Sequence, residues 1–132
     1  MILLTSKILM TVALLLLFFA YSNFAPTALR SPAIAGYTKN HFVREILFGA
    51  VLSGFTIFLI YQNIDMSQWR MILFFGSVVV LPFWVAAACG WTTEGMQQAW
   101  QGEISPRSAY ILHGSQTTLF YVGVTLMYFS IP

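Results

Sequence analysis

Charged residues are scarce in this chain of 132 residues, which has six basic and four acidic side chains, or 8% of its length. Soluble domains average about 25% charge, because charged side chains cover the surface that faces water. Hydrophobic residues make up 58% of the chain instead, and a disordered chain needs low hydrophobicity and high charge. The sequence therefore predicts a single-domain integral membrane protein over residues 1–132.

The sequence also has little cysteine and no cluster of charged residues. Cys89 is the single cysteine, which excludes an internal disulfide and a multi-cysteine metal site. The net charge of +2 is not gathered in a basic run, so nucleic acid is not an expected partner. The sequence has no glycine-rich phosphate loop, no serine elbow and no carboxylate in the middle of an apolar stretch. We therefore expect no enzymatic activity.

Four stretches are long enough and apolar enough to cross a bilayer. A hydrocarbon core of roughly 30 Å needs about 20 residues of α-helix, and an isolated strand cannot satisfy its backbone in lipid. The stretches lie at about residues 2–21, 46–64, 71–91 and 109–131. We therefore expect an all-α fold with four transmembrane helices in an antiparallel bundle.

The first stretch also fits a cleavable signal peptide. Lys7 would be its basic start, and Ala20, Tyr21 and Ser22 would form a tolerable cleavage site. Removal would leave the most basic connection on the outer side of the membrane, against the usual charge bias. We expect the stretch to be retained as a helix.

The connections between these helices carry their own signals. Pro26 and Pro32 predict an irregular first connection over residues 22–45. The second connection, residues 65–70, is so short that its two helices should be antiparallel neighbours. Asp65 followed by Gln68 resembles a capping box.

Within the third connection, residues 92–107, we expect residues 94–100 to form a short helix that lies at the membrane interface. Ser105 is expected to cap the last helix, with Pro106 at its first position. Within the third helix, Pro82 is expected to cause a bend near the middle.

Positive charge sets the expected orientation. The first and third connections share four basic residues, Arg30, Lys39, Arg44 and Arg107. The opposite side has two, Lys7 and Arg70. Because basic residues favour the cytoplasmic side, we expect both termini to be non-cytoplasmic, in a membrane such as the bacterial inner membrane.

Small residues mark two helix surfaces that allow another helix to approach closely. The pairs, each four residues apart, are Gly49/Ser53 and Ala50/Gly54 in the second helix and Ala86/Gly90 in the third. Two interpretations stay open, namely packing inside the bundle and an interface with a partner subunit. In either case we expect another helix to cover the surface in the second helix.

The fourth helix carries a stripe of polar side chains inside its apolar stretch. Its members are His113, Gln116, Thr117 and Tyr121. Unpaired polar groups are costly in hydrocarbon, so we expect the stripe to face a neighbouring helix or a cavity. It either fixes the packing by hydrogen bonds or forms part of a binding site.

His41 and His113 are candidate ligands of a cofactor. Two histidines can hold a haem, and with Glu45 they could bind a metal. Their expected depths in the membrane differ by about one helical turn, which disfavours a shared site. The ordinary alternative is an interfacial ion pair, such as Glu45 with Arg107.

These features favour a non-catalytic accessory subunit of a larger respiratory, photosynthetic or transport complex, with lipids and other membrane subunits as partners. The 12 Phe, 6 Tyr and 4 Trp suit contacts with helices, lipids or pigments. One alternative is a self-sufficient protein that binds or transports a lipid, a quinone or another small hydrophobic molecule. A further alternative is a redox subunit that binds haem or a metal.

Overall fold

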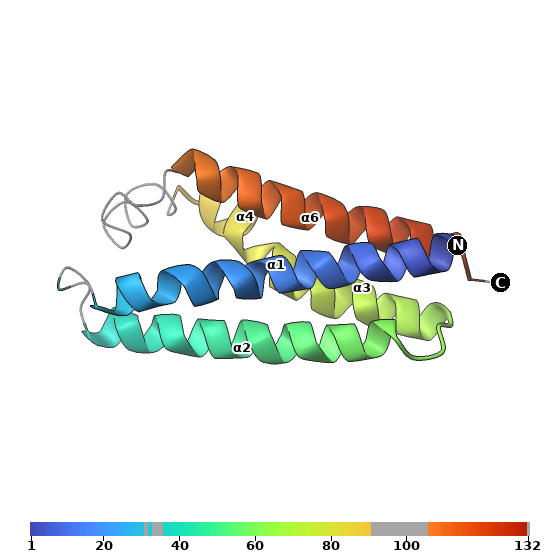
Figure 1. Cartoon of the computed structure of the whole chain (residues 1–132), viewed down its shortest axis with the longest axis horizontal. Coiled ribbons are helices and arrows are strands. Elements are labelled where there is room, and N and C mark those ends of the chain that lie inside the picture. Colours follow the sequence, from blue (N-terminus) through green and yellow to red (C-terminus); the bar gives the residue numbers. More distant parts are fainter. Residues whose placement is uncertain (31, 33–35, 91–105, 132) are drawn as a thin grey trace.

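The described part of the chain is helical throughout its regular structure. The computed structural model describes residues 1–30, 32, 36–90 and 106–131. Within these ranges the chain forms five helices and no strand (Figure 1), namely α1 (Ile2–Arg30), α2 (Gly36–Ile60), α3 (Met66–Val80), α4 (Pro82–Ala88) and α6 (Pro106–Tyr128). The all-α class expected from the sequence is confirmed.

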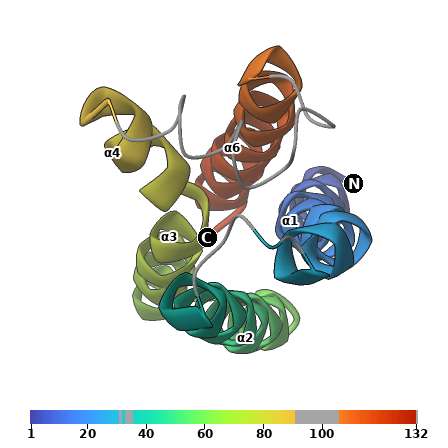
Figure 2. The same ribbon diagram turned by 90° about the vertical axis from the view of Figure 1, so that its left-hand side faces the viewer.

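The long helices run antiparallel around a common core. The chain passes along α1, returns along α2, goes back along α3 and returns along α6 (Figure 1). Seen from the end, α1 lies between α2 and α6, and α3 completes the ring (Figure 2). The contact between α1 and α6 is the most extensive. The start of α1 and the end of α6 therefore lie at the same end of the bundle.

Two helices are long and apolar enough to cross a membrane. They comprise Ile2–Phe19 in α1 and Lys39–Ile60 in α2. The pair α3 and α4 makes a third candidate when it is counted as one bent span. The helix α6 is not among the candidates, because polar residues over 113–118 make it less apolar. These helices are compatible with a membrane protein.

Apolar side chains cover the outside of the bundle as well as filling its core. Large apolar side chains cover the outside, where Phe19 and Val51 are 67% and 70% exposed. The buried polar side chains in the described part are Ser6, Ser53, Thr56 and Gln116. The Ser6 and Thr56 hydroxyls donate 2.7 Å hydrogen bonds to carbonyl oxygens of their own helices. The outer surface therefore suits lipid better than water.

The first connection is shorter than the sequence predicts. The helix α1 continues to Arg30 with Pro26 inside it, and α2 begins at Gly36. The prediction of an irregular segment over residues 22–45 is therefore wrong for most of its length. A proline removes one backbone hydrogen bond, and a helix with apolar packing on both sides of it can continue beyond it.

The second connection ends at a capped helix start. Asp65 has an extended backbone, and its side chain accepts a 2.7 Å hydrogen bond from the Gln68 backbone N–H, so the expected cap is confirmed. The Gln68 side chain does not return to Asp65, as a full capping box requires. Its Nε2 donates to the Leu59 carbonyl oxygen at 3.0 Å. This bond ties the start of α3 to the end of α2.

Pro82 divides the expected third helix into two. The axes of α3 and α4 differ by 48°, which confirms the bend expected at this residue. The helix α4 ends at Ala88, and Gly90 follows with a φ of +73°, a backbone region that favours glycine. Gly90 therefore terminates the helix and forms no small-residue surface with Ala86.

The last helix begins at Pro106, the residue expected at its first position. Ser105 and the short helix expected over residues 94–100 lie outside the described residues. The helix ends at Tyr128, close to the predicted limit.

Two glycines that the sequence analysis did not single out allow the closest contacts between helices. A Cβ atom on Gly123 would lie 3.0 Å from the Ser6 carbonyl oxygen and 3.2 Å from the Met10 amide nitrogen. A Cβ atom on Gly76 would overlap the ring of Phe120, which is fully buried. Glycine at these positions therefore lets α6 pack directly against α1 and α3.

Candidate functional site

A cavity of about 500 Å³ lies among the helices where α4 leaves the bundle. The bend at Pro82 tilts α4 outward (Figure 2), so α4 does not fill the space between α2 and α6. The wall receives residues from all five described helices, for example Leu17, Gly49, Val79, Ala86 and His113. Because Gly49 and Ala86 are small, the space between them stays open.

The cavity wall is mainly apolar, and its described residues include two titratable side chains. These are Glu45 of α2 and His113 of α6. Phe48, which is 62% exposed, also stands in the wall, so the cavity reaches the outer surface of the bundle. An apolar space of this size with a few polar groups is typical of sites that bind small molecules.

The His113 ring is held by two contacts. It stacks on the Phe83 ring of α4, with centroids 3.9 Å apart and planes 12° apart. Its Nδ1 atom lies 3.3 Å from Oε1 of Gln116, one helical turn further along α6. The side chain is half-buried. These contacts fix the orientation of the imidazole in the cavity wall.

Gln116 is 1% exposed and only partly satisfied. Its Oε1 atom pairs with His113, whereas Nε2 has no hydrogen-bond partner among the described residues. A buried donor without a partner costs about 1–3 kcal/mol. The amide therefore adds little to stability, and its main local effect is to orient His113.

The rest of the polar stripe fastens α6 to its neighbours. The indole N–H of Trp84 in α4 donates to Thr117 Oγ1 at 2.8 Å. The Tyr121 hydroxyl pairs with the Ser77 hydroxyl of α3 at 2.9 Å. The structure therefore turns the stripe toward α3 and α4, with His113 at the cavity and the other members in helix contacts.

His41 does not join His113. It is exposed at the start of α2 and lines an outer groove with Arg44, Glu45 and Phe48. Within the described ranges, no group of three His, Cys, Asp or Glu side chains could hold a metal ion. The geometry therefore gives no support to a metal site that includes both histidines.

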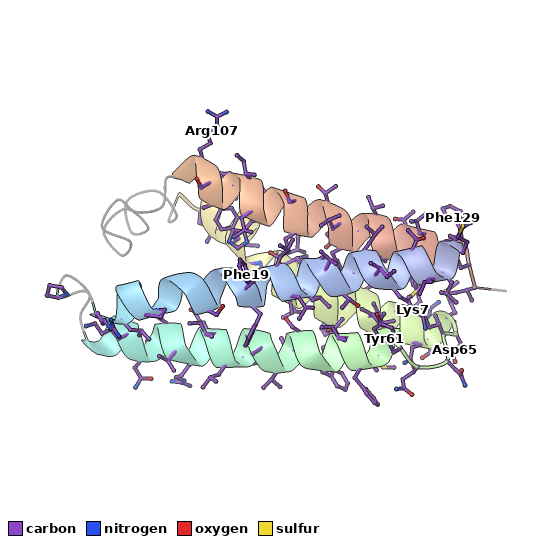
Figure 3. All side chains as sticks on the ribbon, viewed as in Figure 1. Lys7, Phe19, Tyr61, Asp65, Arg107 and Phe129 are labelled. Atoms are coloured by element: carbon purple, nitrogen blue, oxygen red, sulfur yellow. The ribbon has the colours of Figure 1, made fainter. Side chains whose placement is uncertain are left out.

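The ion pair expected between Glu45 and Arg107 is not formed. Figure 3 shows Arg107 on the outer side of α6, away from α2. The earlier start of α2 brings His41, Arg44 and Glu45 into one helix. Glu45 thus stands at the rim of the cavity, between the cavity and the outer groove.

The small residues of α2 divide between two faces. Gly49 lies 4.0 Å from a Leu17 methyl group of α1, measured from the position of a Cβ atom. Ser53 is buried, and Ala50 borders a narrow crevice between α1 and α2. Gly54 faces outward, where no described atom lies within 4 Å of a Cβ. No described helix of this chain therefore covers Gly54.

Phe83 and Trp84 are the site residues that sequence reasoning missed. Both lie directly after Pro82 and contact α6 through His113 and Thr117. The available signal was the proline itself, because a bend turns the residues that follow it toward a different neighbour.

Comparisons with known proteins give no match for this chain. No family model matches it, and no curated protein or solved structure is significantly similar.

Proposed function

We propose that this chain is an integral membrane protein that crosses the bilayer four times and binds a small hydrophobic molecule in the cavity between its helices. The distribution of charge supports four crossings. The described charged side chains divide between two ends of the bundle. Arg30, Lys39, Arg44, Glu45 and Arg107 lie in the end of α1, the first half of α2 and the start of α6, and Lys7, Asp65 and Arg70 lie toward the opposite end. The length between them suits a bilayer core of roughly 30 Å.

Three polar residues of α6, Gln116, Thr117 and Tyr121, turn away from the outer surface, which is compatible with a crossing, whereas Ser115 and Thr118 are exposed. Thr117 and Tyr121 bond to side chains of α4 and α3, and Gln116 is buried. Such contacts between helices are the usual arrangement of polar side chains in membrane bundles. Lys7 lies near the end of its span, with Nζ 5.4 Å from the centroid of the Tyr61 ring (Figure 3).

The orientation follows from the more basic end. Arg30, Lys39, Arg44 and Arg107 lie at the end that we assign to the cytoplasm, so both termini are non-cytoplasmic. A C-terminal alkaline phosphatase fusion should be active, and a C-terminal green fluorescent protein fusion should be dark. The reverse pair of results would contradict this orientation.

Binding is supported by one observation, the cavity of about 500 Å³. It lies about half-way along α1 and α2, it is lined mainly by apolar side chains, and Phe48 connects it with the surface that faces lipid. A hydrophobic molecule in the bilayer can therefore enter sideways without crossing water. Glu45 and His113 are then the groups that contact its polar end.

Two neighbouring residues of α4 provide a matched test. Ala86 lines the cavity, whereas Val85 is 60% exposed on the outside. Saturable binding of the neutral fluorophore N-phenyl-1-naphthylamine should be measured in lipid nanodiscs, with empty nanodiscs subtracted. We expect Ala86→Phe to weaken saturable binding because its ring occupies part of the cavity, and Val85→Phe to leave binding unchanged. Uptake that does not saturate, or equal binding by both variants, would contradict a site in the cavity.

A subunit role in a larger complex is a second proposal, favoured by the outward face of α2. Leu47, Val51, Gly54 and Phe58 are exposed along one side of this helix, and the space around Gly54 is open. A partner helix could approach closely there. A partner that co-purifies at a fixed ratio in mild detergent, and is lost from Gly54→Leu, would support this role. If the partner still co-purifies with Gly54→Leu, this face of α2 is not the interface.

A further inference from the structure

We propose that the cavity selects hydrophobic molecules that carry a positive charge, such as lipophilic amines or quaternary cations. The inference rests on the proposed binding function and assigns the charge of the ligand. The inference depends on Glu45, because this residue is the only acidic side chain among the described residues in the cavity wall.

Glu45 is positioned to meet a charge that enters from the membrane interface. It is exposed at the rim of the cavity, near the basic end of the bundle. The other described residues of the wall are apolar except for His113. Attraction between opposite charges grows as the local dielectric constant falls, so an acidic group beside an apolar space binds a cation more strongly than one in open water.

The neighbouring basic side chains do not line the cavity. Arg44 follows the outer groove on α2, and Arg107 extends from the outer side of α6 (Figure 3). Neither is part of the cavity wall. Among the described residues that line the cavity, no basic side chain accompanies Glu45 apart from the imidazole of His113.

Two other groups in the wall suit a cation. Phe48 is three residues beyond Glu45 on α2, so both lie on one face of the helix, and an aromatic face attracts a cation. Across the cavity, an imidazole whose Nδ1–H donates to the Gln116 amide oxygen presents Nε2 as an acceptor. That nitrogen could accept a hydrogen bond from an ammonium group inside the cavity.

The test uses three probes of nearly equal shape and different charge. They are tetraphenylphosphonium, tetraphenylborate and neutral tetraphenylmethane. Each is titrated into nanodiscs that hold the full chain, Glu45→Gln or Asp65→Asn, with empty nanodiscs subtracted. Because the probes partition differently into lipid, the readout is the ratio of affinities between variant and parent for each probe. Asp65 is the matched control, since it lies at the opposite end and asparagine also caps a helix.

We expect Glu45→Gln to weaken phosphonium binding about five- to tenfold, as for a partly exposed charge pair in a low-dielectric site. The affinity for tetraphenylmethane should not change, and Asp65→Asn should not change any of the three. Equal phosphonium affinity in parent and Glu45→Gln, with tetraphenylmethane still bound, would overturn charge selection and leave the binding function standing. An equal loss for all three probes would also overturn it, because the glutamate would then act on the shape of the site. Absence of saturable binding for every probe would refute the binding function itself.

Discussion

The substitution Gly123→Ala tests the contact that holds α6 against α1. The added methyl carbon would lie 2.6 Å from Met10 Cγ, 3.0 Å from the Ser6 carbonyl oxygen and 3.2 Å from the Met10 amide nitrogen. The Met10 side chain can move, but the two backbone atoms move only if α1 shifts as a whole. Overpacking of this kind costs about 1–3 kcal/mol, and alanine regains about 1 kcal/mol of helix propensity over glycine. We expect a net loss of up to about 2 kcal/mol in the free energy of unfolding.

The control is Gly54→Ala, where no described atom lies within 4 Å of the added methyl group. Both substitutions gain the same helix propensity. The difference between their free energies of unfolding therefore measures the steric clash at Gly123, about 1–3 kcal/mol. Reversible unfolding in mixtures of a mild detergent and sodium dodecyl sulfate, followed by far-ultraviolet circular dichroism, measures both. Equal free energies of unfolding for the two variants would refute the close approach of α6 to the backbone of α1.

Two further substitutions test local contacts. Asp65→Ala removes the acceptor for the Gln68 N–H and should lower the free energy of unfolding by about 1 kcal/mol, whereas Asp65→Asn should retain it; an equal loss in both would contradict the cap. Gln116→Leu removes a buried amide whose Nε2 has no described partner, so the free energy of unfolding should stay unchanged or rise by up to about 1 kcal/mol. A loss above about 2 kcal/mol would show that the amide is fully paired.

Hydropathy and turn residues predicted the class of the fold and the order of its helices. They also located the cap at Asp65 and the bend at Pro82. The limits of the helices were less predictable, because the segment around Pro26 lies outside the most apolar stretch and yet remains helical. The helix α1 also packs against α2 and α6, and a rule based on single residues does not include such packing.

The contacts of the helices were harder to predict than their number. The spacing of Gly49, Ser53 and Gly54 indicates a surface for close approach but not which neighbour occupies it, and Gly54 faces outward. Gly123 meets Ser6 from the opposite end of the sequence, and no local pattern marks that pair. Contacts between the first and last helices depend on the arrangement of the whole bundle.

The candidate site was predictable in part for an energetic reason. Unpaired polar groups are costly in lipid, so the polar stripe of α6 was expected to turn inward to a helix or a cavity. The partners Phe83, Trp84 and Ser77 were not predictable, because their directions depend on the bend between α3 and α4. The cavity depends on the same bend and has no sequence motif of its own.

Photolabelling tests the central claim most directly, namely that the cavity receives a small hydrophobic molecule. The full chain in nanodiscs would be irradiated with a neutral phenyl diazirine, with and without excess unlabelled analogue, and labelled residues identified by mass spectrometry. We expect labels at Phe83 and Val79, which line the cavity and are not among the exposed residues, and we expect the analogue to displace them. Labels confined to the exposed residues Phe58 and Phe74, with no displacement by the analogue, would contradict it.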